Sequence, residues 1–206
     1  MQSNWWYLVV IIPSIVLHEV SHGYVAWKFG DPTAKNAGRL TLNPLSHIDP
    51  FGTVLLPLLL VALGLPPFGW AKPVPVNVSR LRNPRTQNVY VSLAGPLVNI
   101  VLSLIGLGMC RYAVHVNQSN TLLLAGAYIG LPNLTLAIFN LIPIPPLDGS
   151  VVIERFVPAN RMASYYQLRN RALPLVMALV ILDNFTFHRL GALFGMLQTW
   201  WMSLAF

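Results

Sequence analysis

Residues 5–27 read WWYLVVIIPSIVLHEVSHGYVAW, an apolar run that carries two histidines and one glutamate in its second half. As an α-helix this run would extend roughly 35 Å, which is enough to cross the hydrocarbon core of a bilayer. A removable signal peptide would need a basic segment before the apolar run and a cleavage site of small residues after it. Neither is evident here. We therefore interpret it as a membrane helix that stays in the protein.

The composition favours a membrane protein throughout. The chain is 55% hydrophobic and 9% charged, whereas a soluble domain has roughly 25% charged residues. Its net charge of +7 comes from basic residues in the connectors between apolar runs, as in cytoplasmic loops under the positive-inside rule. We thus expect a multi-pass protein in contact with the lipid bilayer, and we exclude nucleic acid as a partner.

Further apolar runs predict the rest of the fold. Two of them, residues 90–111 and 121–142, are long enough to span a bilayer. Residues 51–65 form a run of about half that length, which would be tilted, packed or re-entrant. Residues 172–182 and 190–206 at the C-terminus favour a helical hairpin. The fold class we predict is an all-α polytopic membrane protein with five to six membrane segments.

The connectors between the apolar runs differ from them in character. Residues 30–50 are polar, and the alternating Leu40 and Leu42 suggest short extended structure there. Residues 66–88 read as a loop because of their prolines and arginines. Residues 143–149 are apolar but broken by prolines, and a new helix is expected to start near Gly149. Non-helical backbone survives at membrane depth only where protein or a wet cavity surrounds it. We therefore expect short extended or re-entrant stretches around a buried site.

The pattern His18-Glu19-Val20-Ser21-His22 predicts a metal site on the first helix. Histidines at positions i and i+4 lie on one helix face, where both imidazoles can bind one Zn²⁺. Glu19 follows the first histidine and is placed to act as the general base of a hydrolase. The alternative is a chance coincidence, but ionisable residues within an apolar span are functional by default.

A catalytic zinc site needs a third protein ligand, and the chain has only six carboxylates. Two of these (Asp31 and Asp49) read as turn or cap residues, and two (Glu154 and Asp183) as solvated or ionic surface groups. Asp148 differs, because it ends the proline-broken stretch and precedes Gly149. From the residues alone it is either a metal ligand or the cap of the helix that follows.

Together with the histidine motif, the stretch Asn140-Leu-Ile-Pro-Ile-Pro-Pro-Leu-Asp148-Gly149 resembles the site-2 protease family of intramembrane zinc metalloproteases, peptidase family M50. The resemblance implies one Zn²⁺ held by His18, His22 and Asp148, with Glu19 as the catalytic residue. It also associates Asn140 with substrate binding, although a buried asparagine that stabilises a helix break remains an equal alternative.

Residues 38–53 and 92–99 look like the compact branch of that family, which has no PDZ or CBS domain. We therefore expect residues 1–206 to form a single membrane-embedded metalloprotease domain. The resemblance places it in a prokaryotic cytoplasmic membrane.

The function we expect is zinc-dependent hydrolysis of peptide bonds within or near transmembrane segments of a membrane protein substrate. A helical substrate must unwind first, and residues 38–43 and 68–76 are candidates to pair with it as an added strand. A protease with Glu154 as third ligand is disfavoured, because that residue lacks a helical ligand setting. A catalytically inactive zinc-binding scaffold and a metal transporter remain alternatives. Glu19 disfavours the scaffold, because zinc binding alone does not require it. The convergence of the polar groups on one site disfavours the transporter, which needs polar positions along a whole pathway.

Overall fold

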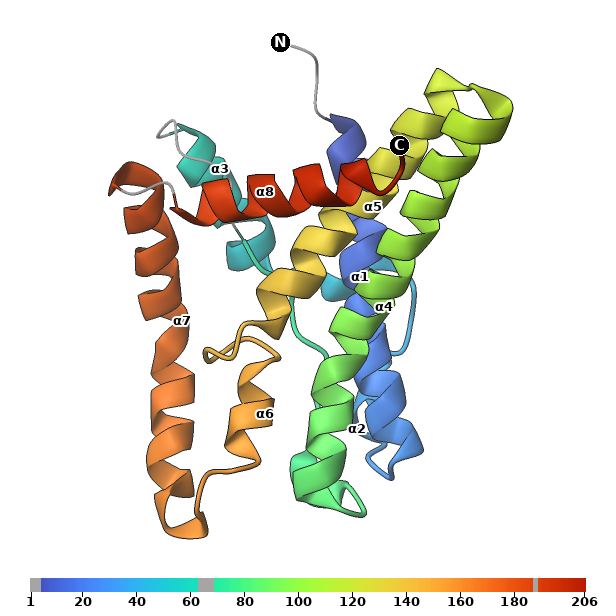
Figure 1. The fold of residues 1–206 in the computed structure, drawn as a ribbon. Coiled ribbons are helices and arrows are strands. Elements are labelled where there is room, and N and C mark those ends of the chain that lie inside the picture. Colours follow the sequence, from blue (N-terminus) through green and yellow to red (C-terminus); the bar gives the residue numbers. More distant parts are fainter. Residues whose placement is uncertain (1–4, 63–68, 187–188) are drawn as a thin grey trace. The chain divides into compact units, whose positions relative to one another are not determined.

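The computed structural model describes residues 5–62, 69–186 and 189–206, and these ranges are predominantly helical (Figure 1). No β-strand occurs within them, which confirms the all-α class. Alternation at Leu40 and Leu42 therefore does not mark a strand, because residues 37–43 form irregular backbone between two short helices. Residues 63–65 of the expected short segment and residues 66–68 of the expected loop lie outside the described ranges.

Among the described residues, three helices are long and apolar enough to cross a membrane. They are α1 (Trp5–Lys28), α4 (Pro84–Tyr112) and α5 (Asn120–Leu141). The apolar helical stretch Pro50–Ala62 is shorter than a span requires. Three candidate spans agree with a membrane protein, while five to six membrane segments remain a prediction.

Helix α4 begins at Pro84, well before the expected start at residue 90, so the prediction of a loop through residue 88 was wrong. Proline suits the first helical position because the N–H that it lacks would have no intrahelical partner there. The Gln87 side chain accepts a hydrogen bond from Asn83 N–H at 2.8 Å. This local capping lets a polar, arginine-containing sequence start a membrane helix.

Chain contacts divide the protein into two compact units, residues 1–10 with 96–206, and residues 11–95. The second unit contains most of α1, the start of α4, and a set of short helices between them. Its apolar cluster is formed by Ala26, Leu81 and Val91. The short helices are α2 (Thr33–Asn36), η1 (Pro44–His47), η2 (Pro50–Leu55), α3 (Leu56–Ala62) and η3 (Val78–Arg80).

The first unit contains the rest of α4, α5 and the C-terminal helices. Helices α4 and α5 approach closely because glycines face each other: a Cβ added at Gly106 would lie 2.5 Å from both Gly126 O and Gly130 N. Such small-residue contacts are the usual way in which membrane helices pack. The remaining elements are η4 (Ala113–Asn117), α6 (Ser150–Glu154), η5 (Ala159–Arg161), α7 (Met162–Thr186) and α8 (Arg189–Ser203).

The C-terminal helices differ from the expected hairpin. Helix α7 starts at Met162 rather than near residue 172, and Figure 1 shows that α8 lies across α5 instead of running back along α7. Trp201 of α8 fills the space beside Gly130, where an added Cβ would lie 2.1 Å from the indole ring. Gln198 also donates a hydrogen bond to Thr135 of α5 at 3.3 Å. These contacts direct α8 toward α5.

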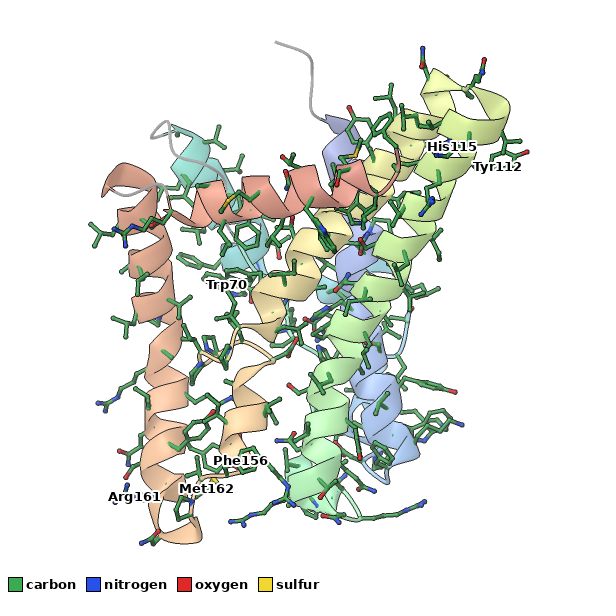
Figure 2. All side chains as sticks on the ribbon, viewed as in Figure 1. Trp70, Tyr112, His115, Phe156, Arg161 and Met162 are labelled. Atoms are coloured by element: carbon green, nitrogen blue, oxygen red, sulfur yellow. The ribbon has the colours of Figure 1, made fainter. Side chains whose placement is uncertain are left out.

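Glu154 ties the short helix α6 to α7, so its interpretation as a solvated carboxylate was wrong. It is buried, with its carboxylate 2.9 Å from the Arg169 guanidinium and 3.0 Å from the Tyr166 hydroxyl. Burial and the adjacent Glu154 charge raise the pKa of Tyr166, which keeps this hydroxyl protonated as a donor. Figure 2 shows Phe156, Arg161 and Met162 at the turn that joins the two helices.

We expect Arg169→Met to destabilise the protein, because it removes the charge partner of the buried Glu154 carboxylate. The loss of a hydrogen bond to a charged group should cost about 1–3 kcal/mol, which lowers Tm by several degrees. Thermal unfolding in detergent measures the shift, and Arg171→Met on the exposed side of the same helix is the matched control. Equal Tm values for the two variants would show that the ion pair does not hold α6.

Candidate metal centre

His18 and His22 lie one turn apart on α1, and their side chains converge. Their Nε2 atoms are 3.1 Å apart, and the rings meet edge to face with centroids separated by 4.7 Å. Two imidazole nitrogens on a tetrahedral zinc ion, each at its usual bond length, would be about 3.3 Å apart. The pair therefore fits two positions of a zinc site with little adjustment.

The backbone of α4 orients the second imidazole. His22 Nδ1 lies 2.7 Å from the Val91 carbonyl oxygen. Because a carbonyl only accepts hydrogen bonds, Nδ1 carries the proton and Nε2 keeps its lone pair for a metal. A metal-binding histidine usually has such a partner on its other nitrogen. The contact thus supports the prediction of His22 as a ligand.

Gly95 of α4 keeps the space in front of both imidazoles open. A Cβ added there would lie 2.5 Å from His22 Nε2 and 2.6 Å from His18 Nε2. Any larger residue would place a carbon where a shared metal ion must sit. Gly95 was not among the predicted site residues, although it lies in the stretch 92–99 that resembles the compact branch of the family.

Glu19 is half-buried beside the two histidines and is held by a distant segment. Its Oε2 atom accepts a hydrogen bond from the backbone N–H of Val74 at 2.9 Å. Val74 lies in the non-helical stretch 69–77, which confirms the expected irregular backbone for the described part of residues 68–76. No side-chain pattern identifies Val74, because the group that it contributes is a backbone amide.

Asp148 lies in the other compact unit, in the turn between α5 and α6. This turn is pinned to the end of α5, since Gly149 N–H donates to Asn140 O at 2.7 Å. A Cβ at Gly149 would lie 2.2 Å from Leu141 O, so only glycine permits the approach. The N-cap of α6 is Gly149, which weighs against Asp148 as the cap of that helix.

The Asn140 side chain donates to Leu136 O at 2.9 Å within its own helix. This bond and the backbone bond to Gly149 give Asn140 a structural role at the helix break. Its side-chain oxygen is still suited to a substrate N–H, so both interpretations of Asn140 stay open. Asn99 of α4 donates a buried hydrogen bond to Asn133 of α5 at 2.7 Å, which is a helix–helix contact.

Four other polar residues lie in or beside short helices. Asp49 caps the start of η2, and Asp31 accepts from Thr33 N–H, as expected of turn and cap residues. His47 is buried with its ring 3.0 Å from Thr41 O. His115 lies in the short helix η4 that follows α4, where Figure 2 labels it.

Two converging imidazoles with a carboxylate between them in sequence, on a helix of membrane length, define a candidate metalloprotease. The chain is 46% identical over 171 residues to YwhC of Bacillus subtilis, which is named as a candidate zinc metalloprotease, and the match covers 78% of this chain and 74% of YwhC. The chain therefore belongs to the zinc metalloprotease family that includes YwhC.

Two mycobacterial proteins, both named as the candidate zinc metalloprotease Rip2, are also similar to it. The Mycolicibacterium smegmatis protein is 38% identical and the Mycobacterium tuberculosis protein 36% identical, each over 143 residues. These matches cover 68% of this chain but only 53% of Rip2, so the chain spans about half the length of these relatives. No family model and no solved structure matches the chain.

We expect Gly95→Ala to abolish zinc binding, because the added methyl group would occupy the space before both Nε2 atoms. Gly108→Ala in the same helix is the matched control, since a Cβ there meets no atom within 4 Å. Zinc content of the purified proteins, measured by atomic emission, checks the expectation. A full complement of zinc in Gly95→Ala would show that the metal does not bind between these nitrogens.

Proposed function

We propose that this protein is an intramembrane zinc endopeptidase of the site-2 protease type. It hydrolyses peptide bonds within or near transmembrane segments of membrane protein substrates. The observation that carries the proposal is the convergence of His18 and His22, with Glu19 between them, on a candidate spanning helix. Ionisable groups at such a depth are costly unless function requires them.

We assign one Zn²⁺ to His18, His22 and Asp148. Support comes from the 3.1 Å spacing of the imidazole nitrogens, the open space beside Gly95, and the glycine-pinned turn that carries Asp148. Two imidazoles and one carboxylate are a usual ligand set for catalytic zinc, which leaves a fourth position open. When bound, zinc polarises a peptide carbonyl and makes water a stronger nucleophile near neutral pH.

Glu19 is the proposed general base and then the general acid. Its carboxylate takes a proton from the attacking water, whose oxygen forms a bond to the carbonyl carbon. It then returns the proton to the leaving nitrogen as the C–N bond breaks. One water is consumed, and a carboxyl and an amino terminus are produced.

The substrate must present an unwound backbone, and two irregular segments are candidates to pair with it. In one of them, residues 68–76, the N–H groups of Trp70, Lys72 and Val74 are already bonded within the protein. Pro73 and Pro75 have no N–H to offer, so this segment can give a substrate mainly carbonyl oxygens. Residues 38–43, where Leu42 is 66% exposed, are therefore the better candidate for strand addition.

We place the protein in the cytoplasmic membrane of a prokaryote, as one membrane-embedded domain of residues 1–206. The bacterial origin of YwhC and of both Rip2 proteins supports this placement. The three apolar helices support integration into the bilayer.

We expect Glu19→Gln to bind zinc normally but to lose cleavage by about 10²–10⁴-fold, because an amide cannot accept the proton. Asp148→Ala should lose zinc as well as activity, since two imidazoles alone hold the ion weakly. Zinc content and cleavage of a single-pass membrane substrate are measured on the same detergent-solubilised samples, with wild type as the reference.

The same samples separate the alternatives. Glu19→Gln that cuts as well as wild type would exclude Glu19 as the base. Wild type that binds zinc but cuts no substrate would favour an inactive scaffold. Zinc uptake into proteoliposomes that contain the wild-type protein would favour a metal transporter.

We expect Asn140→Ala to raise KM several-fold without a change in zinc content, if its side chain binds the substrate backbone. Asn140→Asp keeps the side-chain oxygen and is the conservative control. Michaelis–Menten analysis with a model substrate measures the effect. Lower thermal stability with unchanged KM would instead assign Asn140 to the helix break.

A further inference from the structure

We propose that the segment Trp70–Asn77, here called the strap, positions the general base through the backbone N–H of Val74. The strap holds Glu19 Oε2 and thereby assigns proton transfer to Glu19 Oε1. This inference rests on the proposed function, because it gives Glu19 the role of base. Val74 is a positioning residue in this scheme, since it acts through Glu19 and not on the substrate.

The strap is fixed along one edge by a regular set of hydrogen bonds. Trp70 N–H donates to Gly52 O at 3.2 Å, and Lys72 N–H donates to His47 O at 2.9 Å. Val74 N–H continues this alternation with Glu19 Oε2 as its acceptor at 2.9 Å. Every second residue of an extended chain points the same way, so one register directs all three donors inward.

The prolines occupy the alternate positions of the same stretch, 73 and 75. Proline cannot donate a hydrogen bond, so it is tolerated only where no inward N–H is needed. A shift of one residue would put Pro73 or Pro75 against Glu19 and remove the donor. The sequence therefore fixes which N–H faces the carboxylate.

Gly23 lets the strap lie directly on α1. A Cβ added at Gly23 would be 2.7 Å from the Val74 side chain, 2.7 Å from Leu40 and 2.9 Å from Ala34. The buried Val74 side chain thus packs where Gly23 has none, one turn along the helix from Glu19. This packing sets the distance between the strap and the helix.

The far end of the strap is anchored by a buried carboxylate. Asn77 N–H donates to Asp31 Oδ2 at 2.6 Å, and Asp31 is fully buried. Near the other end, the Thr53 hydroxyl donates to Trp70 O at 2.8 Å. Because hydrogen bonds hold both ends, the strap is a rigid support for Glu19.

The kinetic test compares Val74→Pro with Val74→Ala. Val74→Pro removes the N–H but suits an extended chain that already contains Pro73 and Pro75. We expect kcat to fall about 10- to 100-fold with little change in KM or zinc content, because only the orientation of the base is lost. Val74→Ala keeps the N–H and should retain most of kcat despite its smaller side chain. Wild-type kcat in Val74→Pro would overturn the proposal.

A second test does not depend on activity. Pro73 and Pro75 carry no amide hydrogen, so Val74 is the only exchanging backbone amide between residues 73 and 75. We expect its hydrogen exchange to be at least 10-fold faster in Glu19→Ala than in wild type, whereas Glu19→Gln keeps an acceptor oxygen and should stay protected. The Lys72 amide, bonded to His47 O, serves as the internal control.

Equal exchange at Val74 in wild type and Glu19→Ala would overturn the strap proposal even if the protease proposal holds. Conversely, protection at Val74 together with a wild type that cuts no substrate would keep the contact but refute the proposed function. Loss of zinc in Val74→Pro would show that the strap supports the metal ligands and not the base alone, which also contradicts the proposal.

Discussion

The structure of residues 11–95 depends on one constraint: polar groups within an apolar helix must find their partners inside the protein. Glu19 and His22 lie on α1, where lipid offers no hydrogen bonds. Their partners are backbone groups of remote segments, the N–H of Val74 and the carbonyl of Val91. Satisfying these two side chains therefore brings the strap and the start of α4 against the same helix.

Glycine lets both the strap and the start of α4 lie close to α1. Gly23 admits the Val74 side chain on α1, and Gly95 leaves room on α4 in front of the histidines. In a soluble helix such glycines would cost about 1 kcal/mol each relative to alanine. Close packing compensates for that cost at Gly23, and Gly95 leaves room for the zinc ion that we propose, which explains glycine at these positions of long helices.

The helices and the histidine pair could be predicted from sequence because each rests on local pattern. The apolar runs gave α1, α4 and α5, and the i, i+4 spacing gave the converging imidazoles. What escaped prediction depends on tertiary contact. Glu154 was predicted to be solvated, but Arg169 and Tyr166 of α7 contact its carboxylate and it is buried. Helix α8 lies against α5, because Trp201 packs against Gly130.

A backbone donor is the hardest kind of site group to find from sequence. Any residue except proline supplies an N–H, so the side chain of Val74 carries no trace of the bond to Glu19. The trace lies instead in the neighbouring positions, because Pro73 and Pro75 are compatible with only one alternation of inward donors. In a stretch where prolines alternate with other residues, the positions between them identify the amides that the fold can use. Read in this way, Lys72-Pro73-Val74-Pro75 specifies the position of a donor, while His18 to His22 specifies the position of its acceptor.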